Sequence, residues 1–269
     1  MTTSKRAYVL GHDDPELDRL EHQARMLAPA TGAILGLAGL RPGMRVLDLG
    51  TGAGDVALTA AEIVGEGGEV VGVDIEERAL ALARRRAAER GLGNTVFERG
   101  DVREWSGGRF DAVVGRLILL YCADAPAVIE HHLRALAPGG IYVAMEYDMV
   151  AARSEPACAL GSKALGWMVE AFRRGGMDPA LGTRLDRVLR KAGLDPEILG
   201  LQVYVSPEDG ARSLSGIVSA LMPLIERTGV ATAAEVDLAT LPGRIEAAMR
   251  EVDAVTVYPT LVGAWARRP

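Results

Sequence analysis

The sequence predicts a doubly wound α/β fold built on a mainly parallel sheet. Between residues 44 and 148, short apolar runs alternate with segments of helical spacing. The apolar runs are nearly continuous, as in parallel strands that are buried on both faces. A glycine-rich segment, residues 50–54, follows the first of these runs directly. Such strand–helix alternation is typical of an open sheet with helices on both faces.

The apolar runs predict five strands, which are MRVLDL (44–49), GEVVGVDI (68–75), NTVFERGDV (94–102), FDAVVG (110–115) and GGIYVAMEY (139–147). Three helices are expected between them, over 55–65, 76–91 and 125–140. Gly91 ends the second of these helices, and Pro138 with the two glycines after it ends the third.

The segments that flank this region are mostly helical. Residues 14–40 have helical spacing, with Pro29 expected to divide them into two helices and Leu37 among the inward positions. Later helices are expected over 155–174, 180–193 and most of 208–250, and later strands over 196–206 and 254–265. We therefore expect an N-terminal helical cap (1–40), a ligand-binding core (41–150) and a C-terminal part of the same domain (151–269). A helical lid, about 208–250, is inserted between the last two strands and favours a small, partly apolar ligand beneath it.

The composition of the chain limits the classes of partner that we expect it to bind. The chain has 269 residues, a net charge of −6 and a pI near 5.4, whereas nucleic-acid binders more often carry a basic surface. The opening residues lack the apolar core of a signal peptide, and no apolar run reaches about 18 residues. We expect a cytoplasmic monomer or homodimer that binds neither nucleic acid nor membrane. Cys122 and Cys158 stand apart, so neither a disulfide framework nor a metal site is expected.

Polar residues end each predicted strand, at the edge where open α/β sheets bind ligands. The first three strands end at Asp48, Asp74 and Asp101, the fourth ends near Arg116, and the fifth ends at residues 146–148. Asp74 lies about 24 residues after the first loop glycine and is placed to accept from both hydroxyls of a ribose. Asp101 can accept from the amine of an adenine.

The identity of the nucleotide depends on Asp48. Gly50 and Gly52 allow a tight turn and a close approach to a ligand, which would also suit NAD. Asp48 precedes the loop by two residues, and its charge would repel a pyrophosphate but attract a cation. The spacing is also GxGxG instead of GxGxxG. S-adenosylmethionine (SAM), a cation without phosphate, is therefore favoured over NAD.

The sequence resembles the class I SAM-dependent methyltransferases. VLDLGTGAGDVAL (46–58), VVGVDIEERALALAR (70–84), FERGDVRE (97–104) and the region 110–148 match that family's motifs in order. The resemblance implies a Rossmann-like methyltransferase fold of seven strands with the last one antiparallel. It also implies SAM bound by the core over 41–150, with S-adenosylhomocysteine as product. The N-terminal segment resembles a bacterial subgroup that acts on small molecules, and the implied function is methylation of a secondary metabolite at oxygen, nitrogen or carbon.

The resemblance implies contacts from the loop glycines and Arg116 to the methionine part, from Asp74 to the ribose and from Asp101 and Val102 to the adenine. The expected cofactor-binding residues are Tyr8, Gln23, Arg25, Asp48, Gly50, Thr51, Gly52, Asp74, Ile75, Gly100, Asp101, Val102 and Arg116. Tyr8, Gln23 and Arg25 either close over SAM or only pack their helices on the sheet.

A general base is needed only if the acceptor must lose a proton, because positioning alone supplies much of the rate of methyl transfer. The catalytic candidates are Tyr121, Glu146 and Tyr147, all near the ends of the fourth and fifth strands. His131 and His132 lie in mid-helix and are expected to be structural. Two alternatives stay open: a SAM-binding protein of this fold that catalyses a non-methylating rearrangement or cyclisation, and a non-catalytic SAM-binding module.

Overall fold

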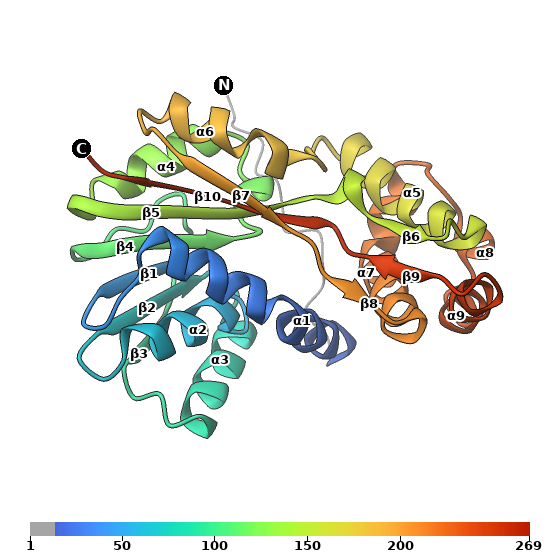
Figure 1. Ribbon diagram of the computed structural model, residues 1–269, viewed down its shortest axis with the longest axis horizontal. Coiled ribbons are helices and arrows are strands. Elements are labelled where there is room, and N and C mark those ends of the chain that lie inside the picture. Colours follow the sequence, from blue (N-terminus) through green and yellow to red (C-terminus); the bar gives the residue numbers. More distant parts are fainter. Residues whose placement is uncertain (1–13) are drawn as a thin grey trace.

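The centre of the molecule is a seven-stranded sheet, seen in a computed structural model that describes residues 14–269, with side chains from residue 25 onward (Figure 1). The strand order is β3-β2-β1-β4-β5-β10-β7. The strands are β1 (Arg45–Leu49), β2 (Glu69–Asp74), β3 (Thr95–Arg99), β4 (Phe110–Arg116), β5 (Leu136–Asp148), β7 (Glu197–Leu201) and β10 (Thr260–Arg267). β1 to β5 pair in parallel, whereas β10 is antiparallel to both β5 and β7. The predicted mostly parallel sheet with an antiparallel last strand is confirmed.

Helices cover both faces of this sheet, because successive strand residues point to opposite faces. Val46 packs into the apolar core shared with α1 (Asp14–Ala38), α2 (Asp55–Val64) and α3 (Glu77–Glu89). Leu47 and Leu49 pack into a second core with α4 (Ala125–Leu133) and α6 (Leu185–Lys191). None of the helices in the described part of the chain is long and apolar enough to span a membrane.

A second unit, which we call the cap, lies beyond the ends of β4 and β5 at the right of Figure 1. Its helices are α5 (Ala159–Arg174), α7 (Pro207–Arg227), α8 (Ala233–Val236) and α9 (Leu241–Glu251). They accompany a three-stranded antiparallel sheet of β6 (Arg153–Glu155), β9 (Val255–Val257) and β8 (Tyr204–Val205), in the order β6-β9-β8. The cap is therefore more than the helical lid expected from the sequence.

Two predicted strands are each divided between the sheets. The run over 196–206 forms β7 in the large sheet and β8 in the cap, and the run over 254–265 forms β9 in the cap and β10 in the large sheet. Pro259 separates β9 from β10, since a proline has no N–H for a ladder hydrogen bond. The prediction of two continuous strands was wrong for this reason.

The N-terminal helix differs from the prediction in two respects. α1 runs unbroken through Pro29, so the expected division into two helices is wrong. The helix contacts α2, α7 and β10, and this packing, with Leu27 and Ile34 fully buried, offsets the hydrogen bond that Pro29 cannot make. Leu37, expected to point inward, is 63% exposed.

Candidate active site

A cavity of about 630 Å³ lies between the carboxyl ends of β1, β2, β4 and β5 and the cap. This volume falls within the range of about 300–1,000 Å³ that is typical of small-molecule sites. One wall consists of the glycine loop and the segments that follow β2, β3 and β4. The other wall is formed by α5, α7 and the residues around β9. The cavity therefore has a sheet wall and a cap wall.

The glycine loop forms the centre of the sheet wall, and its sequence is fixed by local sterics. Gly50 has φ +65°, and a Cβ there would lie 2.6 Å from the Ile118 side chain, so only glycine fits. Gly52 has φ +53° and open space where a Cβ would be. The Thr51 side chain turns inward against Gly72 of β2, where a Cβ would approach its hydroxyl to 2.7 Å. The loop thus presents backbone to the cavity.

Asp74, at the end of β2, is held rigidly beside this loop. Its Oδ2 accepts from the Gly52 N–H at 2.8 Å, and its Oδ1 accepts from the Glu76 N–H at 2.9 Å. Each carboxylate oxygen keeps further acceptor capacity. Ile75, which follows, is 49% exposed and lines the cavity with Asp74. A carboxylate fixed in this way can accept hydrogen bonds from a diol.

The segment after β3 brings Gly100, Asp101 and Val102 to the same cavity. Asp101 is engaged by Arg103, whose N–H and Nε donate to Oδ1 and whose guanidinium also pairs with Oδ2. Behind this segment the buried His132 Nε2 lies 2.6 Å from the Val102 carbonyl, and burial lowers the pKa of His132 to about 4. A neutral His132 therefore supports this turn, in agreement with the structural role expected for it.

Arg116 lines the cavity at the end of β4, but its charge is already paired. It donates to the Thr31 hydroxyl of α1 at 2.8 Å and lies 3.4 Å from Asp55 Oδ2. Asp55, at the start of α2, also binds Arg86 at 2.6 Å. The two guanidinium groups nearest the glycine loop are therefore both bound by Asp55, which also lines the cavity and was not among the predicted residues.

Asp48 lies beneath the glycine loop and is not among the residues that line the cavity. It is 1% exposed, and neither of its oxygens accepts a hydrogen bond within the described part of the chain. Burial raises the pKa of Asp48 to about 7. The electrostatic argument from the sequence placed a fully charged Asp48 against the ligand, whereas the structure places a partly protonated group behind Thr51.

Glu146 is also buried and lies outside the cavity lining. Its Oε1 accepts from the Leu119 N–H at 2.7 Å, in the turn η1 (Leu119–Tyr121) that follows β4. Burial raises the pKa of Glu146 to about 8, against the opposing effect of the backbone N–H groups of this turn. Leu117, at the start of the same segment, adopts φ +58°, a strained conformation for leucine. Glu146 therefore holds the loop and does not face the ligand.

The structure brings most of the predicted residues together. Those that line the cavity are Gly50, Thr51, Gly52, Asp74, Ile75, Gly100, Asp101, Val102, Arg116, Tyr121 and Tyr147. Arg25 is exposed and is not part of the lining. Tyr8 lies outside the described residues, and the side chain of Gln23 is likewise not described.

Sequence reasoning missed most of the cap wall. α5 contributes Leu165, Met168 and Phe172, none of which is among the predicted site residues. α7 contributes Ser213, Leu214 and Ile217, and Tyr258 follows β9. The helical spacing of α7 showed an apolar stripe, but which side of it faced a cavity depends on the packing of α5 and α9. Pro259 was the one local signal that a loop, and hence Tyr258, would interrupt the last strand.

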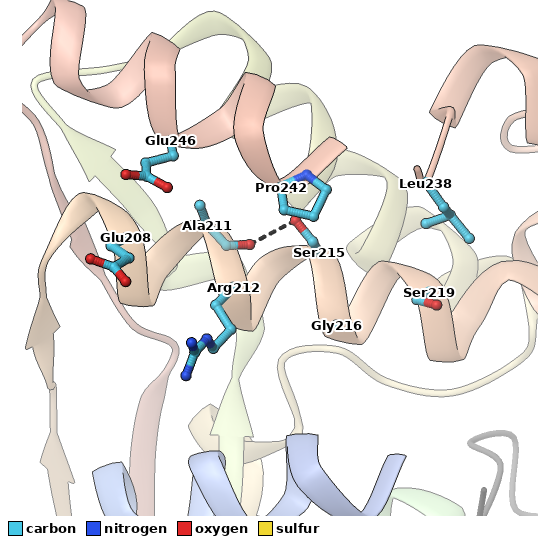
Figure 2. A pocket seen from close by; sticks show the side chains of 9 residues that line it. All are labelled: Glu208, Ala211, Arg212, Ser215, Gly216, Ser219, Leu238, Pro242 and Glu246. Carbon is cyan, nitrogen blue, oxygen red and sulfur yellow. Dashed lines mark hydrogen bonds between the residues drawn. The ribbon is translucent and has the colours of Figure 1, made fainter. Parts of the chain in front are cut away.

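A second cavity, of about 390 Å³, lies between α7 and α9 (Figure 2). Its walls carry Glu208, Arg212 and Glu246 together with small residues of α7, among them Ser215, whose hydroxyl donates to the Ala211 carbonyl at 2.7 Å. The small residues explain the space, because they leave little side-chain volume between the two helices. Ser219 lines this cavity, whereas Ile217, two residues earlier, lines the first.

Comparison with known proteins identifies the domain that carries this site. A family model described as "Methyltransferase domain" matches residues 40–193, which is more than half of the chain. The chain belongs to this methyltransferase family. The predicted class I SAM-dependent methyltransferase domain is thereby confirmed, and with it SAM as the cofactor of the domain.

Individual relatives are also methyltransferases. The chain is 40% identical over 114 residues to nocamycin O-methyltransferase of Saccharothrix syringae, covering 42% of this chain and 41% of that protein. It is 36% identical over 115 residues to the ubiquinone/menaquinone biosynthesis C-methyltransferase UbiE of Ectopseudomonas mendocina, covering 42% and 45%. The chain thus spans less than half the length of the curated relatives it matches.

A solved structure, of a putative methyltransferase from Bacillus halodurans, has the same fold. It superposes with a TM-score of 0.58 at 17% identity, over 90% of this chain and 99% of that one. The likeness supports the fold assignment for nearly the whole chain. The curated relatives match less of the chain, about two fifths of it.

Proposed function

We propose that the protein is a SAM-dependent methyltransferase that acts on a small-molecule acceptor, with SAM along the sheet wall and the acceptor against the cap wall. The observation that carries this proposal is the Asp74 carboxylate, fixed by the Gly52 and Glu76 N–H groups on the wall of the cavity. It can bind the two ribose hydroxyls. The site is poor for a pyrophosphate, because Arg86 and Arg116 are already paired with Asp55 and the Asp74 carboxylate lies beside the glycine loop.

The remaining residues of the sheet wall fit the other parts of SAM. The loop over 50–52 would hold the methionine part, with the paired Arg116 beside it. Ile75 and Val102 would enclose the adenine, and Asp101, bound by Arg103, would accept from its amine. Asp48 would lie beneath the loop and act on the cationic cofactor through its charge, without contacting it. The N-terminal segment (1–40), the core (41–150) and the C-terminal part (151–269) with its lid (about 208–250) would form one catalytic domain.

SAM supplies a methyl group activated by a sulfonium, so the protein needs mainly to align the acceptor and exclude water. Tyr121 and Tyr147 reach the cavity from η1 and the end of β5, and they are the groups placed to contact the acceptor. Glu146 would be a positioning residue, because it holds the backbone of the turn that carries Tyr121.

Thermal melting tests the cofactor assignment. S-adenosylhomocysteine at 100 times its Kd should stabilise the protein by about 2.7 kcal/mol, and NAD should not stabilise it. Asp74→Ala should abolish this effect. Asp195→Ala, at a carboxylate that is 98% exposed, should retain it. Stabilisation by NAD alone, or an undiminished shift in Asp74→Ala, would contradict the proposal.

Transfer itself is tested with SAM that carries a labelled methyl group. Incubation of the protein with a metabolite extract of a bacterial secondary-metabolite producer should move the label into a small molecule. The relatives named for O- and C-methylation support this reaction class. A SAM-dependent conversion without label in the product would support the non-methylating rearrangement or cyclisation instead, and SAM binding without any conversion would support a binding module.

A further inference from the structure

The charged residues of the large cavity all lie on the sheet wall. They are Asp55, Asp74, Glu76, Asp101, Arg103 and Arg116. The cap wall, and the part of the lining over 117–122 and 147–152, contains no charged side chain among the described residues. Among the described residues, the charged side chains of the cavity therefore all lie on the sheet wall, which is the wall assigned to SAM.

Five of these six charged side chains are also engaged already. Asp101 is bound by Arg103, and Arg116 is bound by Asp55 and Thr31. The Asp74 carboxylate is held by two backbone N–H groups. An acceptor that carried a carboxylate, phosphate or ammonium group would find no counter-ion among the described residues on the cap side of the cavity.

The cap wall is built from large apolar side chains. Leu165, Met168 and Phe172 of α5 face the cavity with Leu214 and Ile217 of α7. A charge transferred from water to such surroundings is strongly disfavoured unless it is paired, whereas apolar surface is favoured. Neutral polar groups are nonetheless present on this side, at Ser213 and Tyr258.

From this distribution of charge we infer that the acceptor is an uncharged, lipophilic molecule, selected by the cap wall against acceptors that carry a formal charge. The inference rests on the proposed function and specifies its substrate class. Ile217 is the most informative position, since it is only partly buried and can receive a longer side chain. A cation placed there would change the selectivity of the cap wall without touching the sheet wall.

Two fluorescent probes with one skeleton test the inference on protein saturated with S-adenosylhomocysteine. N-phenyl-1-naphthylamine is neutral, and 8-anilino-1-naphthalenesulfonate adds one sulfonate to the same rings. We expect the neutral probe to bind at least tenfold more tightly. Ile217→Lys should weaken the binding of the neutral probe at least tenfold. It should also narrow or invert the difference in affinity between the two probes, because the new cation pairs with the sulfonate. Ile217→Met should behave as the unmodified protein does.

Ser219→Lys is the matched control, two residues further along α7 and facing the second cavity (Figure 2). It should leave the binding of both probes unchanged. Equal binding of the two probes, no binding of the neutral probe, or an effect of Ser219→Lys as large as that of Ile217→Lys would overturn the inference. In each variant the thermal shift with S-adenosylhomocysteine reports folding and the cofactor site. If S-adenosylhomocysteine does not raise the Tm of the unmodified protein, the proposed function is refuted. If it raises the Tm but the neutral probe does not bind more tightly than the sulfonate, only the acceptor class is refuted.

Discussion

Two buried carboxylates, Asp48 and Glu146, lie behind the cavity wall and are not among the residues that line the cavity. Both sit at the ends of central strands and both have a raised pKa because of burial. Their differing partners suggest differing roles. Glu146 accepts backbone hydrogen bonds from the turn after β4, whereas the oxygens of Asp48 accept none in the described part of the chain.

Glu146→Gln should change the pH dependence of stability. The folded protein retains the Glu146 proton up to pH of about 8, whereas the unfolded chain releases it near 4.5. The stability contributed by this proton is complete below about pH 4.5 and is lost as the pH rises through 8. Glutamine keeps the oxygen acceptor but cannot ionise. We therefore expect the Tm difference between Glu146→Gln and the unmodified protein to shift in favour of the variant by several degrees between pH 5 and pH 9, by melting at each pH.

Glu130→Gln, at an exposed position of α4, is the control and should give a Tm difference that is flat across this range. A flat profile for Glu146→Gln as well would show that Glu146 is ionised in the folded protein at neutral pH. The same experiment separates a positioning role from a catalytic one. A positioning Glu146 predicts that the glutamine variant keeps its activity, because the bond to Leu119 is preserved.

At the scale of elements, α1 is attached to the sheet wall by a side-chain hydrogen bond between Thr31 and Arg116. The Thr31 hydroxyl is fully buried and accepts from the Arg116 guanidinium at 2.8 Å. Thr31→Val keeps the shape of the side chain and removes the acceptor. Hydrogen bonds to charged groups contribute about 1.5–3 kcal/mol, so we expect a loss of about 2 kcal/mol in urea unfolding. Thr59→Val removes a hydroxyl that bonds only its own helix backbone, and it should cost clearly less.

S-adenosylhomocysteine binding provides the second readout for Thr31→Val. If the bond orients Arg116 toward the cavity, the variant should bind the product several-fold more weakly, measured by calorimetric titration. A stability loss without a change in affinity would show that the bond only attaches the helix.

The elements that the sequence predicted best are those with strong local signals. The glycine loop, Asp74 and Asp101 follow buried strands, and parallel strands bring their carboxyl ends to one edge. The division of the last two strands was missed because the segment over 196–206 has continuous β-type composition. Only Pro259 marked either break. The depth of Asp48 could not be predicted either, because it depends on Thr51 turning inward over Gly72.

On the scale of the whole molecule, the cap and the large sheet share one apolar core. The core that includes Val46 and Leu58 also includes Trp167 of α5, Leu221 of α7 and Ile245 of α9. We therefore expect a single cooperative unfolding transition in scanning calorimetry, with equal calorimetric and van't Hoff enthalpies. Two resolved transitions, or a van't Hoff enthalpy well below the calorimetric one, would show that the cap unfolds independently. The sequence alone predicted one domain but could not show this shared core, since its members are far apart in the chain.

The chain passes between the large sheet and the cap along four connections, at 149–152, 175–180, 202–203 and 258–259. Two of them are bonded to each other, because the Tyr258 N–H donates to the Val203 carbonyl at 2.9 Å. The cap is thus joined to the large sheet at several points of the chain. The cap can move as a unit only if all four connections bend together, so the entry of an acceptor and the exit of a product would share one direction of motion.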